Sequence, residues 1–344
     1  MTGKLTVSVI GLGTMGTTLA RLLLGGGYRV TVWNRTRRKA DVLVEEGTVA
    51  PPSAAAAIAA SDVVIVCVYD YKAANEILAT KEVEAALAGR VIVQLTTGSP
   101  QEARDGELWA RRHHADYVDG AIQAAPSQMA RPDTTILVSG AESAYRRSEP
   151  VLSVFGGNVK YLGEPVGAAS TMDLATLSYV YGAALGFFHG ARIAESEGFR
   201  VDHYGGLVAE ISPSFGEFFR HEGAVIQSGD YRVSESPLKI SVEATERLAQ
   251  AARDGGLNAE LPEFAARLFK RALAAGYGDQ EVAAFIKVLR ASGSDSREHP
   301  AHEREHVGSP VSHGKGGCAM KPRVSRAGPL ASERMGDGGR KTDQ

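Results

Sequence analysis

Short apolar runs alternate with amphipathic stretches through the first half of the chain. The runs at residues 7–10, 62–68 and 90–95 are typical of strands that are buried on both faces. Between the first two runs, the stretch after Gly13 carries its leucines at helical spacing, which predicts a helix with one buried face. This alternation predicts an α/β domain built on a parallel sheet.

The same pattern continues to about Gly163. It predicts further helices at about 53–60, from about Ala73, and at about 100–114, and further strands near 116–119 and 134–139. The first domain is therefore expected to span residues 1–164.

Residues 167–198 form one long helical segment that is apolar on most sides. A helix of this kind must be buried, either in a large core or against a second chain. The segment that follows, to about residue 290, has the pattern of several amphipathic helices. We therefore expect an interdomain helix at 165–198 and an all-α domain at 199–290, shared in a homodimer.

The character of the sequence changes after residue 290. Residues 291–344 are rich in Gly, Ser, Arg and His without a sustained period, which predicts a disordered tail without a function of its own. Its four histidines, His299, His302, His306 and His313, lack carboxylate or thiolate partners at fixed spacing, so no metal site is expected.

Composition narrows the class of protein. Of the residues 44% are apolar and 23% charged, and the net charge of −2 argues against a nucleic-acid or membrane-surface binder. The only cysteines, Cys67 and Cys318, cannot build a disulfide framework, and Cys67 lies in an apolar run, as expected for a core thiol. No run has the length of a membrane span, and the first residues lack a signal-peptide pattern. We expect a cytoplasmic protein.

A glycine motif follows the first predicted strand. Gly11, Gly13 and Gly16 form G-x-G-x-x-G between a strand and a helix. In this context the first glycine allows a tight turn, the second lets the backbone approach a pyrophosphate, and the third lets the helix pack on the strand. The motif predicts a Rossmann domain that binds a dinucleotide at the helix N-terminus, with Leu12, Thr14 and Met15 also in contact with it.

A further strand is predicted after this first helix, and the residues at its end indicate which dinucleotide binds. NAD-binding versions place an acidic residue here for the ribose 2′-hydroxyl, whereas this chain has Asn34, Arg35, Thr36 and Lys39. Cations and neutral donors suit a 2′-phosphate, so NADPH is the expected cofactor.

The carboxyl ends of the later strands are the expected place for the nicotinamide half. Ligands of open parallel sheets lie at that edge, so Cys67, Val68 and Thr96 are predicted to contact the cofactor.

Five segments together carry a family resemblance. They are GLGTMGTTLARLLLGGGYRVTVWNRTRRKA, QLTTGSP, DGAIQAAP, GAASTMDLATLSYVYG and GYGDQEVAAFIKVLR. With them the chain resembles the imine reductase and reductive aminase family, relatives of the β-hydroxyacid and 6-phosphogluconate dehydrogenases, over about residues 5–290. The resemblance implies an oxidoreductase that reduces imines to amines with NADPH.

The discriminating position implied by the resemblance is Asp173, where β-hydroxyacid dehydrogenases carry a lysine. Imine reduction passes through an iminium-like cation, which a lysine would repel. At an effective dielectric near 20, unit charges about 4 Å apart interact by roughly 4 kcal/mol, so a carboxylate favours an imine over a carbonyl. Reductive aminases pair this Asp with a Tyr eight residues later, which implies that Tyr181 is the second catalytic residue.

The resemblance implies a substrate pocket as well. Gln94 stands where reductive aminases commonly have Asn, so imine reduction is expected and reductive amination stays open. The loop at 119–126 is too apolar to hold a carboxylate substrate. Pocket residues of the second domain are expected at Ser214, Phe215, Ile240 and Ser241.

Two alternatives remain open from the sequence. One is a β-hydroxyacid dehydrogenase that acts on a small hydroxy acid. The other is a non-catalytic NADP-binding sensor, which would have the cofactor site without a working cleft.

Overall fold

The computed structural model describes residues 5–291 of the 344-residue chain. The predicted disordered tail, with its four histidines and Cys318, lies outside the described residues apart from Ala291.

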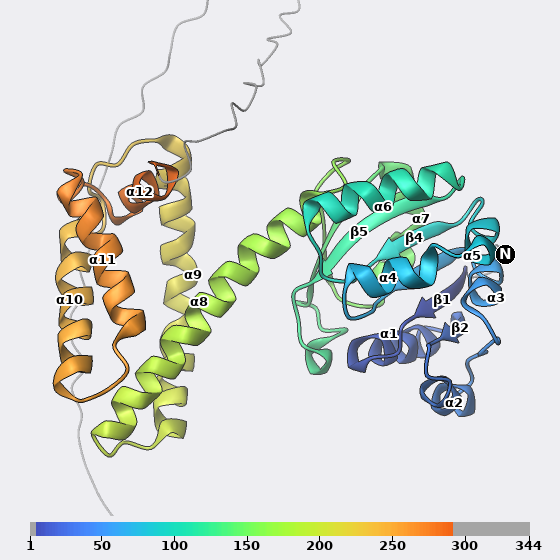
Figure 1. Cartoon of the computed structure of the whole chain (residues 1–344), viewed down its shortest axis with the longest axis horizontal. Helices are drawn as coiled ribbons and strands as arrows, with labels where there is room; N and C mark the ends of the chain where they lie inside the picture. Colours follow the sequence, from blue (N-terminus) through green and yellow to red (C-terminus); the bar gives the residue numbers. More distant parts are fainter. Residues whose placement is uncertain (1–4, 292–344) are drawn as a thin grey trace, which may run out of the picture. The chain divides into compact units, whose positions relative to one another are not determined.

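A seven-stranded sheet forms the first domain (Figure 1). Its strands, in chain order, are β1 Thr6–Ile10, β2 Arg29–Trp33, β3 Val63–Val66, β4 Val91–Gln94, β5 Asp116–Ile122, β6 Thr135–Gly140 and β7 Asn158–Tyr161. They are arranged in the order β2-β1-β3-β4-β5-β6-β7, and all neighbours are parallel except β5 and β6. The predicted Rossmann domain is confirmed, with one antiparallel pair in a mostly parallel sheet.

Helices connect these strands. They are α1 Thr14–Gly25, α2 Arg38–Glu45, α3 Ala54–Ala59, α4 Tyr71–Leu78, α5 Lys81–Ala86, α6 Pro100–Arg112 and α7 Glu142–Leu152, with the 3-10 helix η1 Pro126–Gln128. Side-chain caps define several starts: Thr80 accepts from the Val83 N–H at α5, and Ser99 forms a capping box with Glu102 at α6. The sequence interpretation missed α5, α7 and β7.

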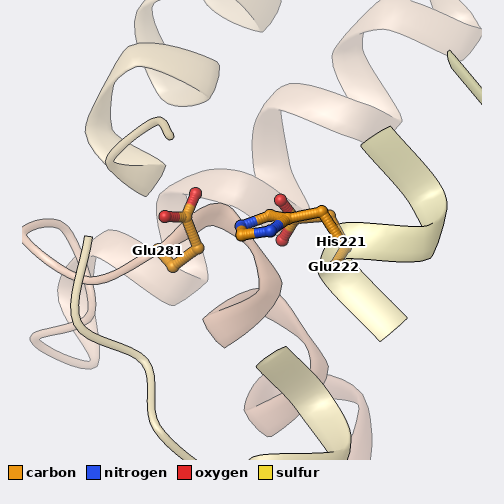
Figure 2. A group of neighbouring side chains, drawn as sticks. All are labelled: His221, Glu222 and Glu281. Atoms are coloured by element: carbon orange, nitrogen blue, oxygen red, sulfur yellow. The ribbon is translucent and has the colours of Figure 1, made fainter. Parts of the chain in front are cut away.

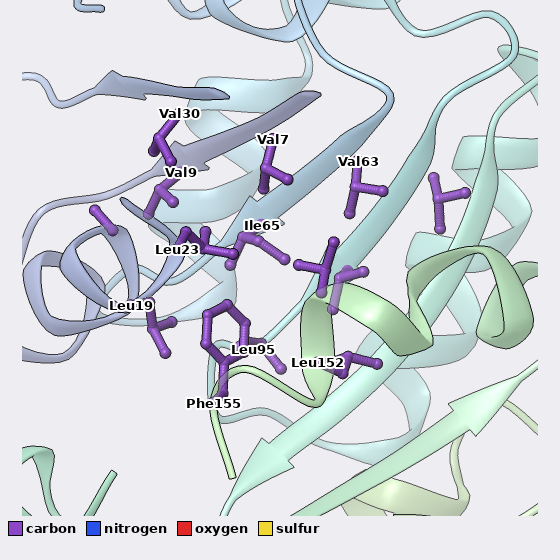
Figure 3. Close-up of a cluster of buried hydrophobic side chains, with 14 of the residues drawn as sticks. Val7, Val9, Leu19, Leu23, Val30, Val63, Ile65, Leu95, Leu152 and Phe155 are labelled. Carbon is purple, nitrogen blue, oxygen red and sulfur yellow. The ribbon is translucent and has the colours of Figure 1, made fainter. Parts of the chain in front are cut away.

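The core of the domain lies on both faces of the sheet. On one face, side chains of β1 and β3 meet Leu19 and Leu23 of α1 and Phe155, which follows α7 (Figure 3). These three side chains are completely buried. Burying an aromatic or leucine side chain in this way stabilises the fold by about 1.5–3 kcal/mol.

Helices alone form the rest of the described chain. They are α8 Ala168–Ser196, α9 Val201–Ser228, α10 Leu238–Asp254, α11 Glu260–Ala274, the 3-10 helix η2 Val282–Phe285 and α12 Ile286–Ala291. A small core around Leu238, Val242 and Ala272 joins α10 and α11. None of the helices within residues 5–291 combines the length and the hydropathy that a membrane crossing requires.

The predicted burial of the long helix α8 is not met within one chain. Its buried residues are Ala169, Ser170, Asp173 and Ala191, whereas Leu185 is 58% exposed and Phe188 64% exposed. The described part of the chain therefore does not supply the first alternative, a large core around α8.

Candidate active site

The glycine loop follows β1 as the sequence predicts. Gly11 has φ of +100°, a conformation that side chains rarely adopt, and a Cβ there would also strike the Cys67 carbonyl oxygen. A Cβ on Gly16 would strike the carbonyl oxygen of Gly11. These two positions therefore require glycine for the turn and for the packing of α1.

Gly13 differs from the other two glycines. It is the N-cap of α1, no side chain caps the helix there, and a Cβ on it would meet no atom within 4 Å. The first N–H groups of α1 therefore border open space, and the positive end of the helix dipole faces the same way. This cradle fits the pyrophosphate of a dinucleotide.

A cleft of about 960 Å³ lies at the glycine loop, large enough for a cofactor. Twelve of the thirteen predicted cofactor contacts line it: Gly11, Leu12, Gly13, Thr14, Met15, Gly16, Asn34, Arg35, Thr36, Lys39, Cys67 and Val68. The thirteenth, Thr96, is buried, and its Oγ1 accepts a hydrogen bond of 3.1 Å from the Val68 N–H. Thr96 thus does not line the cleft itself but holds the backbone of the lining residue Val68.

Asn34 links the two loops that border the cleft, the glycine loop and the loop after β2. Its Oδ1 accepts a hydrogen bond of 3.0 Å from the Leu12 N–H, and its Nδ2 donates to the Thr36 carbonyl oxygen at 3.1 Å. The glycine loop and the loop after β2 are therefore held in register by one side chain.

The charges at this end of the cleft come from Arg35 and Lys39. Arg37 is turned away, because its guanidinium donates to the Ala50 carbonyl oxygen at 2.6 Å and pairs with Asp41 at 3.0 Å. Two cations beside the Thr36 hydroxyl suit a 2′-phosphate.

Lining residues that the sequence interpretation missed come from loops and helix starts. They include Trp33, Pro52, Ser53, Glu76, Ile77 and Thr80. Ser53 and Thr80 cap α3 and α5, so the capping pattern was the available signal for these segments.

Cys67 is half-buried rather than enclosed in the core, and it lines the cleft. Burial raises the pKa of its thiol to about 11, so the thiol stays protonated and unreactive at neutral pH.

Asp173 lies in the second turn of α8 and is only 5% exposed. Gln123, just after β5, donates from Nε2 to its Oδ1 at 2.6 Å. Burial raises the pKa of the Asp173 carboxyl group, and the Gln123 hydrogen bond partly offsets that rise. This environment therefore disfavours the ionised form of Asp173 relative to a carboxyl group in water.

A second buried carboxyl group, Asp119 of β5, was not assigned a role from the sequence. It accepts hydrogen bonds from the Ser170 N–H at 3.1 Å, from the Ser170 hydroxyl, and from the Tyr71 hydroxyl at 3.0 Å. Burial raises its pKa to about 6, against the effect of these donors, and the charge of Asp173 adds to the rise. Asp119 ties the first turn of α8 to the sheet.

Tyr181 lies on the same helix as Asp173, eight residues or about 12 Å further along the axis. Its side chain is 66% exposed. The structure does not bring Tyr181 into contact with Asp173, and their action on one substrate stays a prediction.

The predicted substrate contacts are spread over both domains, and none of them lines the dinucleotide cleft. Gln94 is 2% exposed, and its Oε1 accepts a hydrogen bond of 3.1 Å from the Thr96 N–H, so it orders the end of β4. Ser214 and Phe215 lie on α9, and Ile240 and Ser241 lie on α10. Their contact with substrate stays a prediction.

The helical domain holds a separate ionisable cluster of His221, Glu222 and Glu281 (Figure 2). Glu281 accepts hydrogen bonds of 2.6–2.9 Å from the three backbone N–H groups of residues 234–236. Although burial alone would raise the pKa of Glu281, these donors lower it to about 2. Because these donors occupy the carboxylate oxygens of Glu281, we assign this residue to holding the loop of residues 234–236 before α10, rather than to binding a metal.

Two family models match the chain. The NAD binding domain of 6-phosphogluconate dehydrogenase matches residues 6–163. The C-terminal domain of NADPH-dependent reductive aminase-like proteins matches residues 165–291.

Individual relatives match over the same range. The NADPH-dependent reductive aminase of Aspergillus oryzae is 30% identical, over 83% of this chain and 97% of that protein. The structure of the imine reductase from Myxococcus stipitatus in complex with NADP+ is 30% identical in sequence and has a TM-score of 0.78. The match covers 83% of this chain and 99% of that one. The structure of the reductive aminase from Aspergillus terreus in complex with NADPH4, cyclohexanone and allyl amine is 35% identical in sequence and has a TM-score of 0.77. The match covers 84% of this chain and 100% of that one.

Proposed function

Because the chain belongs to the imine reductase and reductive aminase family, we propose that it catalyses the NADPH-dependent reduction of imines to amines. The observation that carries the proposal is Asp173, a buried carboxyl group with a raised pKa at the start of α8. It stands where the lysine of a β-hydroxyacid dehydrogenase would be expected. The dehydrogenase and the non-catalytic sensor are not favoured.

The cleft residues fit the cofactor. The N-terminus of α1 would hold the pyrophosphate, and Arg35, Thr36 and Lys39 would hold the 2′-phosphate. When bound, NADPH supplies the reducing equivalent for the C=N carbon. The chain itself has to bind the substrate and manage the proton and the charge on nitrogen.

Asp173 performs the proton step in this proposal. In its protonated form it donates to the substrate nitrogen, and the carboxylate that remains stabilises the iminium-like cation that is then reduced. Tyr181 provides a second polar contact. Gln94, Ser214, Phe215, Ile240 and Ser241 complete the proposed substrate pocket.

The enzyme is proposed to work as a homodimer that shares its helical domains. Support comes from the large apolar side chains that α8 and α9 leave exposed, among them Tyr179, Leu185, Phe188, Leu207 and Phe215. Light scattering at micromolar concentration tests this, since a monomer mass would contradict it. Cytoplasmic residence also stays a proposal, consistent with the free Cys67 thiol.

Reductive amination of carbonyl compounds is the second candidate reaction. The Aspergillus terreus relative, crystallised with a ketone and an amine, supports it. It would use the same cleft and the same Asp173 chemistry, with the imine formed before it is reduced.

A direct comparison of substrates tests the proposal. NADPH consumption is followed with 2-methyl-1-pyrroline, and with cyclohexanone plus allyl amine; NADP+ reduction is followed with 3-hydroxyisobutyrate. We expect turnover with the imine and none with the hydroxy acid. Turnover of the hydroxy acid alone, or tight NADPH binding with no turnover in any assay, would contradict the proposal.

A further inference from the structure

We propose that Gln123 is a positioning residue that holds the Asp173 carboxyl group in place in both of its protonation states. The inference rests on the proposed role of Asp173 in proton transfer. Gln123 and Asp173 are 50 residues apart in the sequence, and the fold brings them together where the chain leaves β5 and enters α8.

Both ends of the Gln123 amide are engaged. Nε2 donates to Asp173 Oδ1 at 2.6 Å, and Oε1 accepts from the Thr176 hydroxyl at 2.7 Å. The Thr176 Oγ1 also lies 2.9 Å from the Asp173 carbonyl oxygen. The backbone N–H of Gln123 donates to the Thr135 carbonyl oxygen at 3.0 Å, which fixes the residue at the edge of the sheet. These contacts hold the plane of the amide between Asp173 and Thr176 of α8.

An amide carries one donor and one acceptor group, so it can serve either form of a carboxyl group. The observed arrangement suits ionised Asp173, because the amide N–H faces a carboxylate oxygen. When Asp173 is protonated, a half-turn of the amide lets Oε1 accept from the carboxyl O–H. Nε2 then donates to Thr176 Oγ1, whose proton goes to the Asp173 carbonyl oxygen. Both ends of the amide and the Thr176 hydroxyl therefore have a hydrogen-bond partner in either state.

This property matters for a group that gives up and regains a proton in each cycle. The proton leaves the Asp173 oxygen for the substrate nitrogen, and water supplies the next one. Without a partner that adapts, one of the two states would leave a partly buried polar group unpaired, which is unfavourable. The neighbouring carboxyl group of Asp119 adds negative charge, which makes a donor toward ionised Asp173 more important.

Two substitutions at Gln123 test the proposal. Gln123→Met keeps the length of the side chain without its hydrogen bonds, and we expect kcat for imine reduction to fall about tenfold or more. NADPH affinity should be unchanged, and the pKa in the kcat profile should move upward, because ionised Asp173 has lost its donor. Gln123→Glu places a second carboxyl group beside Asp173, so the pKa in the kcat profile of this variant should move upward further than in Gln123→Met.

Matched variants separate this effect from a loss of packing. Thr176→Val should give a smaller shift in the same direction, and Thr176→Ser should restore the wild-type profile. Gln101→Met, on the exposed face of α6, is the control for the glutamine substitution and should leave both kcat and profile unchanged.

The outcomes distinguish this inference from the proposed function. If Asp173→Asn is inactive while Gln123→Met keeps the wild-type kcat and pH profile, the role of Gln123 is refuted and that of Asp173 stands. If Asp173→Asn keeps full activity, the catalytic role of Asp173 fails, and the role of Gln123 fails with it. Should Gln123→Met not fold, a wild-type profile in Thr176→Val overturns the proposal.

Discussion

The buried carboxyl group of Asp119 predicts a pH dependence of stability that one substitution should remove. Burial raises its pKa from 3.8 to about 6, so the folded protein binds this proton more tightly than the unfolded chain does. Stability is therefore gained as the pH falls through 6 and lost as it rises. Asp119→Asn keeps the shape of the side chain and removes its titration.

The magnitude follows from the two pKa values. At pH 8 the group is ionised in both states and contributes no difference. At pH 5 protonation of Asp119 favours the folded state over the unfolded state about tenfold, which corresponds to about 1.4 kcal/mol in the free energy of unfolding. The free energy of unfolding of the wild type, measured relative to Asp119→Asn, should therefore increase by about 1.4 kcal/mol from pH 8 to pH 5.

Urea unfolding of both proteins at the two pH values, at one protein concentration, measures this difference. Asp133→Asn, the same substitution at an exposed position of the same domain, is the matched control. If Asp119→Asn keeps the full pH dependence of the wild type, then the titration of Asp119 is not coupled to folding, and the reasoning is refuted.

Three further predictions concern the cofactor cleft and the core. Gly13→Ala should fold normally, since the added Cβ meets no atom, but it should weaken NADPH binding in a fluorescence titration. Gly16→Ala should instead lower the melting temperature, because the added Cβ meets the carbonyl oxygen of Gly11. Lys39→Glu should raise the Kd for NADPH far more than that for NADH; equal changes would place the 2′-phosphate elsewhere. Phe155→Ala should lower the free energy of unfolding by about 3–5 kcal/mol in urea, and a loss below about 1 kcal/mol would contradict its place in the core.

The parts of the site that the sequence predicted are local. Gly11, Gly13 and Gly16 follow a strand directly, and residues 34–39 follow the next one, so strand and helix patterns suffice to place them. The lining of the cleft by these residues follows from the edge at which parallel strands end.

The parts that it did not predict depend on contacts between distant segments. The pairing of Gln123 with Asp173 spans 50 residues, and the bond from Ser170 to Asp119 spans 51. No spacing rule connects such positions. The buried state of Gln94 was missed for a different reason, because a polar residue at a strand end can face either the cleft or the interior.

Three elements escaped detection because their patterns are weak. The strand β7 has four residues and none is fully buried, and α5 and α7 carry many charged residues. At α8 the apolar composition left two alternatives open, a large core or a second chain, and one chain does not cover the helix. Its apolar residues point to the proposed dimer instead of to a core.

The most direct test of the account is the kinetics of Asp173→Asn with 2-methyl-1-pyrroline, together with NADPH binding by the same variant. General acid catalysis contributes about 100-fold or more to such a reaction. We therefore predict that kcat falls by about that factor while the Kd for NADPH stays at the wild-type value. A variant that keeps the wild-type kcat, or one that loses only cofactor affinity, would contradict the central role of Asp173.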